Sequence, residues 1–131
     1  MKRTLELSLI LVILIFLSGC GQQAAESLSQ TSGNYSATLR FDPDPPALMT
    51  SEGMTLTLLD SDGQPVNGAE VGFDLTMPAM KMPPNQPSAT ARGNGIYQTE
   101  ATFTMAGQWQ VDAAVFLNGE TIHFIFSFDV E

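Results

Sequence analysis

The strongest constraint on the fold is a hairpin signal, Asn118-Gly119, close to the end of the chain. Asn-Gly is the preferred sequence of a two-residue turn between antiparallel strands. Such a turn pairs Leu117 with Glu120 and therefore Val115 with Ile122. The same register also pairs Ala113 with Phe124 and Val111 with Phe126. Because a slip of one residue would move one apolar row to the opposite face, the sequence predicts a hairpin with a defined register.

Apolar and polar residues alternate with a period of two through most of the chain from residue 35 onward. This pattern is typical of strands that bury one face. Apolar rows are expected at Tyr35–Phe41, Met54–Leu58, Val71–Met77, Tyr97–Met105, Trp109–Leu117 and Ile122–Val130, with a short strand at Ser88–Arg92. Seven short strands without a convincing helical pattern predict an all-β fold, an immunoglobulin-like seven-stranded sandwich.

The first twenty residues have the pattern of an export signal. Lys2 and Arg3 precede an apolar run from residue 7 to 17. This run is shorter than the roughly 20 apolar residues that a transmembrane helix needs. The following Leu17-Ser18-Gly19-Cys20 resembles the bacterial lipobox, which implies that Cys20 is acylated and begins the mature protein. The alternative is an uncleaved anchor helix with an incidental cysteine. Both interpretations place the domain outside the cytoplasm, at a membrane of the bacterial cell envelope.

These signals divide the chain into three parts. Residues 1–19 are predicted to be a lipoprotein signal peptide. Residues 20–34, rich in Gln, Ser, Ala and Gly, are predicted to be a flexible tether that begins at the lipid anchor. Residues 35–131 are expected to form one β-sandwich domain.

Charge and cysteine content exclude several functions. The chain carries five basic and fourteen acidic residues, a net charge of −9. Loss of residues 1–19 leaves three basic and thirteen acidic residues, a charge of −10. A nucleic-acid partner needs a basic face and is therefore not expected. A single cysteine excludes an internal disulfide and a cysteine-pair zinc site. Lipid, rather than charge, must hold the protein at an anionic membrane surface.

No enzymatic activity is expected. The one histidine, His123, lies within a strand and faces away from the row of Phe124. Asp60 and Asp62 lie in a turn-rich connection, where carboxylates usually cap backbone amides. The chain also lacks a glycine-rich phosphate loop. The sequence therefore predicts neither a catalytic residue nor an organic cofactor.

The methionines are the most informative residues for function. The segment Thr76–Pro84 contains Met77, Met80 and Met82. Thioether sulfur is a soft ligand that selects Cu(I), and an extended Met80-x-Met82 stretch would place both side chains on one face. Met80 and Met82 are therefore the first candidate ligands, with Met77 and Met105 in support. Alternatively, these methionines fill the open end of the sandwich.

The predicted topology gathers the methionines at one end. In the expected strand order, the connections at residues 43–52, 78–87 and 106–107 lie at the same end of the sandwich. All six methionines after residue 20 lie in or beside these connections: Met49, Met54, Met77, Met80, Met82 and Met105. This arrangement suits a metal site, but equally a soft hydrophobic surface for a partner.

The spacing of these residues resembles the YtkA-like domain family over roughly Tyr35 to Val130. The motifs are Met77-Pro78-x-Met80-x-Met82-Pro83, Gly95-x-Tyr97 and Phe103-x-Met105-x-Gly107-x-Trp109-x-Val111. Similar domains occur as small lipoproteins, in relatives of FixH proteins, and joined to heavy-metal efflux adaptors. The resemblance implies extracytoplasmic handling of copper without enzymatic activity, with an envelope metal-handling or efflux protein as partner.

Two functions therefore remain open at this point. The first is binding or transfer of Cu(I) by a membrane-anchored lipoprotein through its methionine-rich loop. The second is a metal-free protein–protein interaction module of an envelope complex. In both, Trp109 and Tyr97 are expected to serve the core, beside the methionine-rich end.

Overall fold

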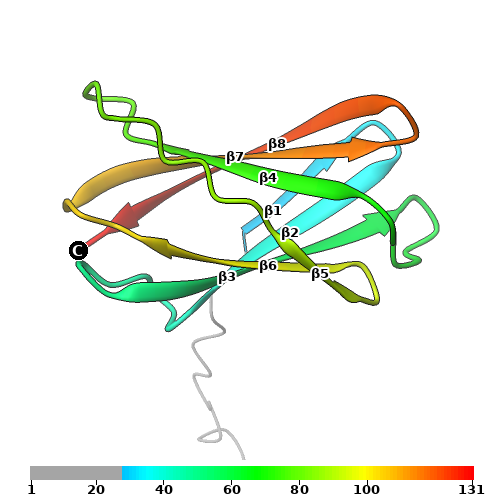
Figure 1. Ribbon diagram of the computed structural model, residues 1–131, viewed down its shortest axis with the longest axis horizontal. Helices are drawn as coiled ribbons and strands as arrows, with labels where there is room; N and C mark the ends of the chain where they lie inside the picture. Colours follow the sequence, from blue (N-terminus) through cyan, green and yellow to red (C-terminus); the bar gives the residue numbers. More distant parts are fainter. Residues whose placement is uncertain (1–27) are drawn as a thin grey trace, which may run out of the picture.

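The computed structural model describes residues 28–131, which form two antiparallel β-sheets (Figure 1). The predicted signal peptide, Cys20 and the first part of the tether lie outside the described residues. The strands are β1 (Leu28–Ser32), β2 (Tyr35–Asp42), β3 (Ser51–Asp60), β4 (Glu70–Thr76), β5 (Thr90–Gly93), β6 (Ile96–Thr102), β7 (Gly107–Leu117) and β8 (Glu120–Val130). Within this part of the chain, no helix is long and apolar enough to cross a bilayer.

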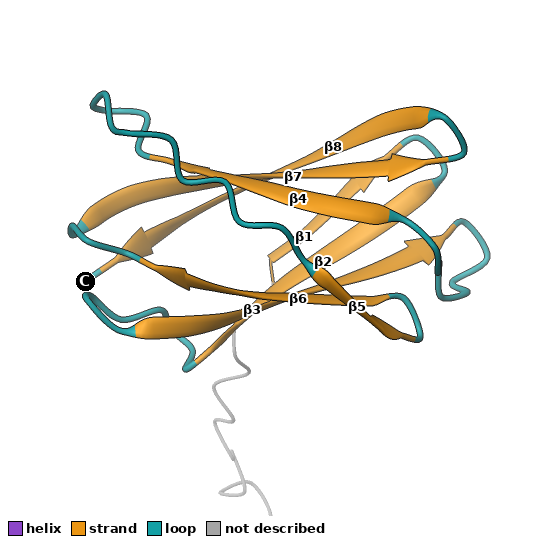
Figure 2. Ribbon diagram, viewed as in Figure 1, coloured by secondary structure: helices purple, strands orange, loops and turns teal. Residues whose placement is uncertain are grey.

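The two sheets are layered as a sandwich (Figure 2). One has five strands in the order β1-β2-β3-β6-β5, and the other has three in the order β4-β7-β8. The predicted all-β sandwich is therefore present, but it has eight strands in place of the expected seven.

The additional strand, β1, corrects the predicted boundary of the tether. Residues Leu28–Ser32 pair with β2, from Leu28 opposite Leu39 to Ser32 opposite Tyr35. Three of its five residues are exposed. Backbone hydrogen bonds, rather than burial of an apolar row, therefore define this edge strand, and the sheet includes residues 28–32, which the sequence assigned to the tether.

The predicted register of the last hairpin is confirmed. Leu117 lies opposite Glu120 and Val115 lies opposite Ile122. Asn118 and Gly119 have φ angles of 53° and 80°, the left-handed conformation that this type of tight turn requires. The hairpin places Val111, Ala113, Val115, Phe124 and Phe126 together in the core.

Aromatic rings fill the core between the two sheets at one end. Phe103 packs edge-on against Trp109, with their ring centroids 5.1 Å apart, and against Phe41 at 5.8 Å. Phe128 closes this cluster, 4.7 Å from Phe41. Full burial of an apolar side chain such as Phe103 contributes roughly 1.5–3 kcal/mol through removal from water.

A strap formed by residues 85–89 joins the two sheets along one side. The Phe73 amide donates to the Pro87 carbonyl and the Leu75 amide to the Asn85 carbonyl, each at 2.9 Å. These bonds satisfy the edge of β4 that β7 does not cover. The strap then enters β5 of the opposite sheet, so the chain crosses between layers here (Figure 1).

Candidate metal centre at the methionine-rich end

Three loops meet at one end of the sandwich (Figure 1). They comprise residues 43–50, 77–89 and 103–106, and we call this region the methionine-rich end. The Met49 amide donates to the Phe103 carbonyl at 2.8 Å, which joins the first loop to the third. The Met77 methyl lies 3.2 Å from the point where a Cβ on Gly107 would stand. Because Gly107 directly follows the third loop, the second loop also lies beside the third, and the predicted meeting of these connections is confirmed.

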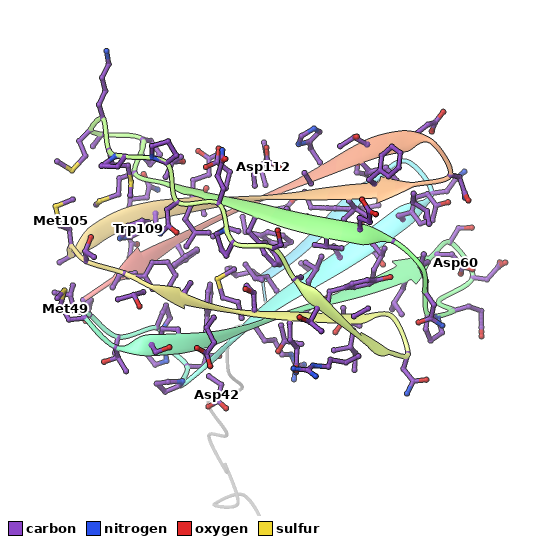
Figure 3. All side chains as sticks on the ribbon, in the orientation of Figure 1. Asp42, Met49, Asp60, Met105, Trp109 and Asp112 are labelled. Carbon is purple, nitrogen blue, oxygen red and sulfur yellow. The ribbon has the colours of Figure 1, made fainter. Side chains whose placement is uncertain are left out.

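The loops present their methionines at different depths. Met49 is 68% exposed and Met80 is 48% exposed, whereas Met77 is buried. Met82 and Met105 are half-buried and pack against the core. Figure 3 shows Met49 and Met105 at the same end of the molecule. This end thus combines exposed thioethers with thioethers held by packing.

Met54 does not share this position. It is fully buried within β3, opposite Phe41 on β2 and Thr99 on β6. Five methionines therefore belong to the loops, and Met54 is a core residue instead of the sixth member that the topology predicted.

The loop around Met80 begins with a tight turn, directly before the Met80-x-Met82 stretch that the sequence predicted to be extended. The Met80 amide donates to the Met77 carbonyl at 3.2 Å, which closes a tight turn through Pro78. This turn brings Met77 and Met80 together through the backbone. Met80 is half exposed and Met82 packs against the core, so the two first-choice candidates differ in exposure.

Trp109 holds the third loop in place from within the core. Its ring is fully buried, and its Nε1–H donates to the Met105 carbonyl at 2.9 Å. This bond fixes the backbone of Met105 relative to β7 (Figure 3). The predicted core role of Trp109 is confirmed.

Tyr97 is also a core residue, but its contacts lie at the opposite end. Its hydroxyl donates to the Val66 carbonyl at 2.8 Å and accepts from the Ala69 amide at 3.2 Å. Tyr97 therefore holds the connection between β3 and β4 and does not support the methionine-rich end.

Glu52 is a feature of this end that sequence reasoning missed. Its side chain is fully buried on the inward row of β3, two residues before Met54. Oε1 accepts a hydrogen bond from the Ala47 amide at 2.8 Å, which ties down the first loop. Oε2 is buried and has no hydrogen-bond partner among the described residues. Extending the alternation of Met54, Leu56 and Leu58 back by two residues would have placed Glu52 inside.

The other candidate residues lie away from this end. The His123 ring lies on the outward side of β8, where Nδ1 contacts the two carboxylate oxygens of Asp112 at 2.9 and 3.0 Å. Oδ1 of Asp60 accepts from the amides of Asp62 and Gln64, both at 2.9 Å, which confirms the predicted turn. Within residues 28–131, no group of three or more His, Cys, Asp or Glu side chains could hold a metal ion.

An open groove of about 530 Å³ lies on the outward face of the five-stranded sheet. Gly53 lies in its lining between Asp42 and Glu100, its partners on the neighbouring strands. Arg92 also lines it, and its Nε–H donates to Gln98 at 3.2 Å. The groove has no histidine among its lining residues, and Met54 is its only methionine.

Comparison with known proteins gives one positive result. The model of a protein family described as YtkA-like matches residues 29–114, about two thirds of the chain. The match begins within β1 and ends within β7, so it includes all three loops of the methionine-rich end. The search of curated proteins found no match.

Proposed function

The chain belongs to the YtkA-like family, and from this premise we propose that it binds Cu(I) at its methionine-rich end. Met80 and Met82 are the proposed first ligands, and Met77 and Met105 are supporting ligands. The protein would bind the ion and pass it to a metal-handling or efflux protein of the bacterial cell envelope. This role requires no enzymatic activity.

The observation that carries this proposal is the gathering of three methionine-bearing loops at one end. Residues 28–131 contain no cysteine, so soft-metal chemistry in the described domain rests on thioether sulfur. Thioethers are neutral, and they exchange a bound ion without taking up or releasing a proton. The half-exposed Met80 can reach a partner's ligands, while the packed Met82 and Met105 have less conformational entropy to lose on binding.

The proposal also includes a lipid anchor on Cys20. The lipobox-like Leu17-Ser18-Gly19-Cys20 supports it, as does the formal charge of −10 beyond residue 19. A chain of this charge is repelled by anionic headgroups. An acylated cysteine would hold the domain at an extracytoplasmic membrane surface.

The direct test is a Cu(I) titration against a competing chelator. We expect Met80→Leu and Met82→Leu together to weaken Cu(I) binding by about tenfold or more, a loss of about 1.4 kcal/mol. Leucine keeps the apolar volume of methionine but removes the sulfur, so the fold is retained. Met54→Leu is the matched control, because Met54 is buried in the core, and it should leave the affinity unchanged. Equal affinity in the double variant would contradict the proposal.

A second function is favoured by the exposure of Met49 and Met80. Exposed methionine adapts its shape to a partner surface, so this end also suits a metal-free interaction module of an envelope complex. The titration separates the two functions, since an interaction module would show no Cu(I) binding that depends on Met80 and Met82.

A further inference from the structure

The outward side of the three-stranded sheet differs from an ordinary solvated surface. We define the acidic outer face as the outward residues of β4, β7 and β8. On it, Phe116 and Ile125 are 47% and 48% exposed. Outward positions of half-buried strands are usually polar. Two large apolar side chains on this sheet therefore need an explanation beyond the fold.

The charges on this face have one sign. Its outward positions include Glu70, Asp74, Asp112 and Asp129, and none is Lys or Arg. Asp74 lies directly opposite Asp112 on the neighbouring strand. Such a like-charge cross-strand pair is destabilising. His123 contacts Asp112, and no salt bridge to Asp74 forms within the described region.

The apolar and acidic groups form one continuous surface. The cross-strand rows run in order from Glu70 and Phe116, through Gly72, Ala114 and His123, to Asp74, Asp112 and Ile125. Gly72 and Ala114 are small and leave the β4 and β7 part of the middle row low, while the exposed His123 ring stands in its β8 part. Asp112 lies on this outward side of the sheet (Figure 3).

We propose that the acidic outer face is a docking surface for a cationic protein segment that carries apolar side chains. Phe116 and Ile125 would contact the apolar side chains, and Lys or Arg of the partner would lie against Asp74 and Asp112. Charge complementarity selects this occupant. A second copy would bring like charges together, and an anionic membrane surface would be repelled. The inference is independent of copper, because this face carries no methionine.

The test uses the full chain in a nonionic detergent without copper, and NMR amide shifts as the readout. The probe is the short peptide Lys-Phe-Lys-Phe-Lys, compared with Lys-Ser-Lys-Ser-Lys and Glu-Phe-Glu-Phe-Glu. We expect only the first to shift the amides of residues 112–116 and 123–125, with an affinity that falls as salt is raised. Equal binding of the serine peptide would overturn the proposal, because charge alone would then explain it.

Matched variants locate the contact. Phe116→Ser and Ile125→Thr, made separately, should each weaken binding of the probe peptide by about threefold or more. Met49→Ser, which removes an even more exposed apolar side chain at the methionine-rich end, should not. Asp74→Asn should weaken binding of the probe peptide. Glu100→Gln, which makes the same charge change on the other sheet, should leave this binding unchanged. If Glu100→Gln lost as much affinity for the probe peptide as Asp74→Asn, the proposal would be overturned. Self-association of the chain that Phe116→Ser abolishes would also overturn it, by identifying a second copy as the occupant.

Discussion

At the scale of single residues, Glu52 is the most unusual side chain of the described domain. Every other fully buried side chain in this region is apolar or aromatic. Its Oε1 holds the first methionine loop through Ala47, but its Oε2 has no partner. A buried carboxylate without full compensation costs stability. Glu52 therefore holds a loop of the proposed metal site in place and lowers the stability of the folded domain.

We expect Glu52→Gln to raise the free energy of unfolding by about 1–2 kcal/mol. Glutamine keeps an oxygen for the Ala47 amide and removes the charge. Urea unfolding of the metal-free protein measures the change. Glu100→Gln is the control, since Glu100 is exposed and its loss should change stability by less than about 0.5 kcal/mol. A stability loss of more than about 1 kcal/mol in Glu52→Gln would show that the native carboxylate is compensated.

At the scale of secondary structure, the turn before β6 holds two elements together. Gly95 has a φ of +71°, and a Cβ there would stand 2.5 Å from the Leu58 carbonyl oxygen and 3.1 Å from the Val66 amide nitrogen. Both atoms belong to backbone and cannot move aside as a flexible side chain would. The close approach lets the Leu58 amide donate to the Gly95 carbonyl at 2.8 Å.

Gly95→Ala should therefore destabilise the domain by about 2 kcal/mol or more, through both strain and collision. Gly72→Ala makes the same chemical change in β4, where φ is ordinary and no atom lies within 4 Å of the new Cβ. It should be neutral or raise stability by up to about 1 kcal/mol, because alanine reduces the entropy of the unfolded chain. Thermal unfolding compares the pair, and similar shifts in both variants would refute this description of the turn.

Elements that bury an alternating apolar row could be predicted from the sequence, and others could not. The β7–β8 register follows from one turn and two apolar rows, and the structure matches it pair by pair. By contrast, β1 forms through backbone pairing of mostly exposed polar residues, which leaves no periodic signal. The strap at residues 85–89 pairs with β4 although it contains Pro87. At the site, topology predicted the loops that meet. The inward position of Glu52 follows from the alternation of β3, but its hydrogen bond to the Ala47 amide and the turn from Met77 to Met80 depend on local packing.

At the scale of the whole molecule, the two ends of the sandwich differ in construction. The tight turns at Asn94 and Asn118 and the Tyr97-held connection close one end. The three loops that carry five methionines close the other (Figure 1). The acidic outer face lies along the side of the molecule, on the three-stranded sheet. The proposed metal site and the proposed docking surface are therefore separate, and a partner could occupy the face while the methionine-rich end stays accessible.

The central claim is that thioether sulfur at this end binds Cu(I), and X-ray absorption at the copper edge tests it most directly. The protein loaded with one equivalent of Cu(I) should show a first coordination shell dominated by sulfur. In the Met80→Leu and Met82→Leu double variant, this sulfur signal should fall, because only the supporting ligands Met77 and Met105 remain, whereas Met54→Leu should leave it unchanged. A shell of nitrogen and oxygen ligands, or a sulfur signal that is undiminished in the double variant, would contradict the proposed site.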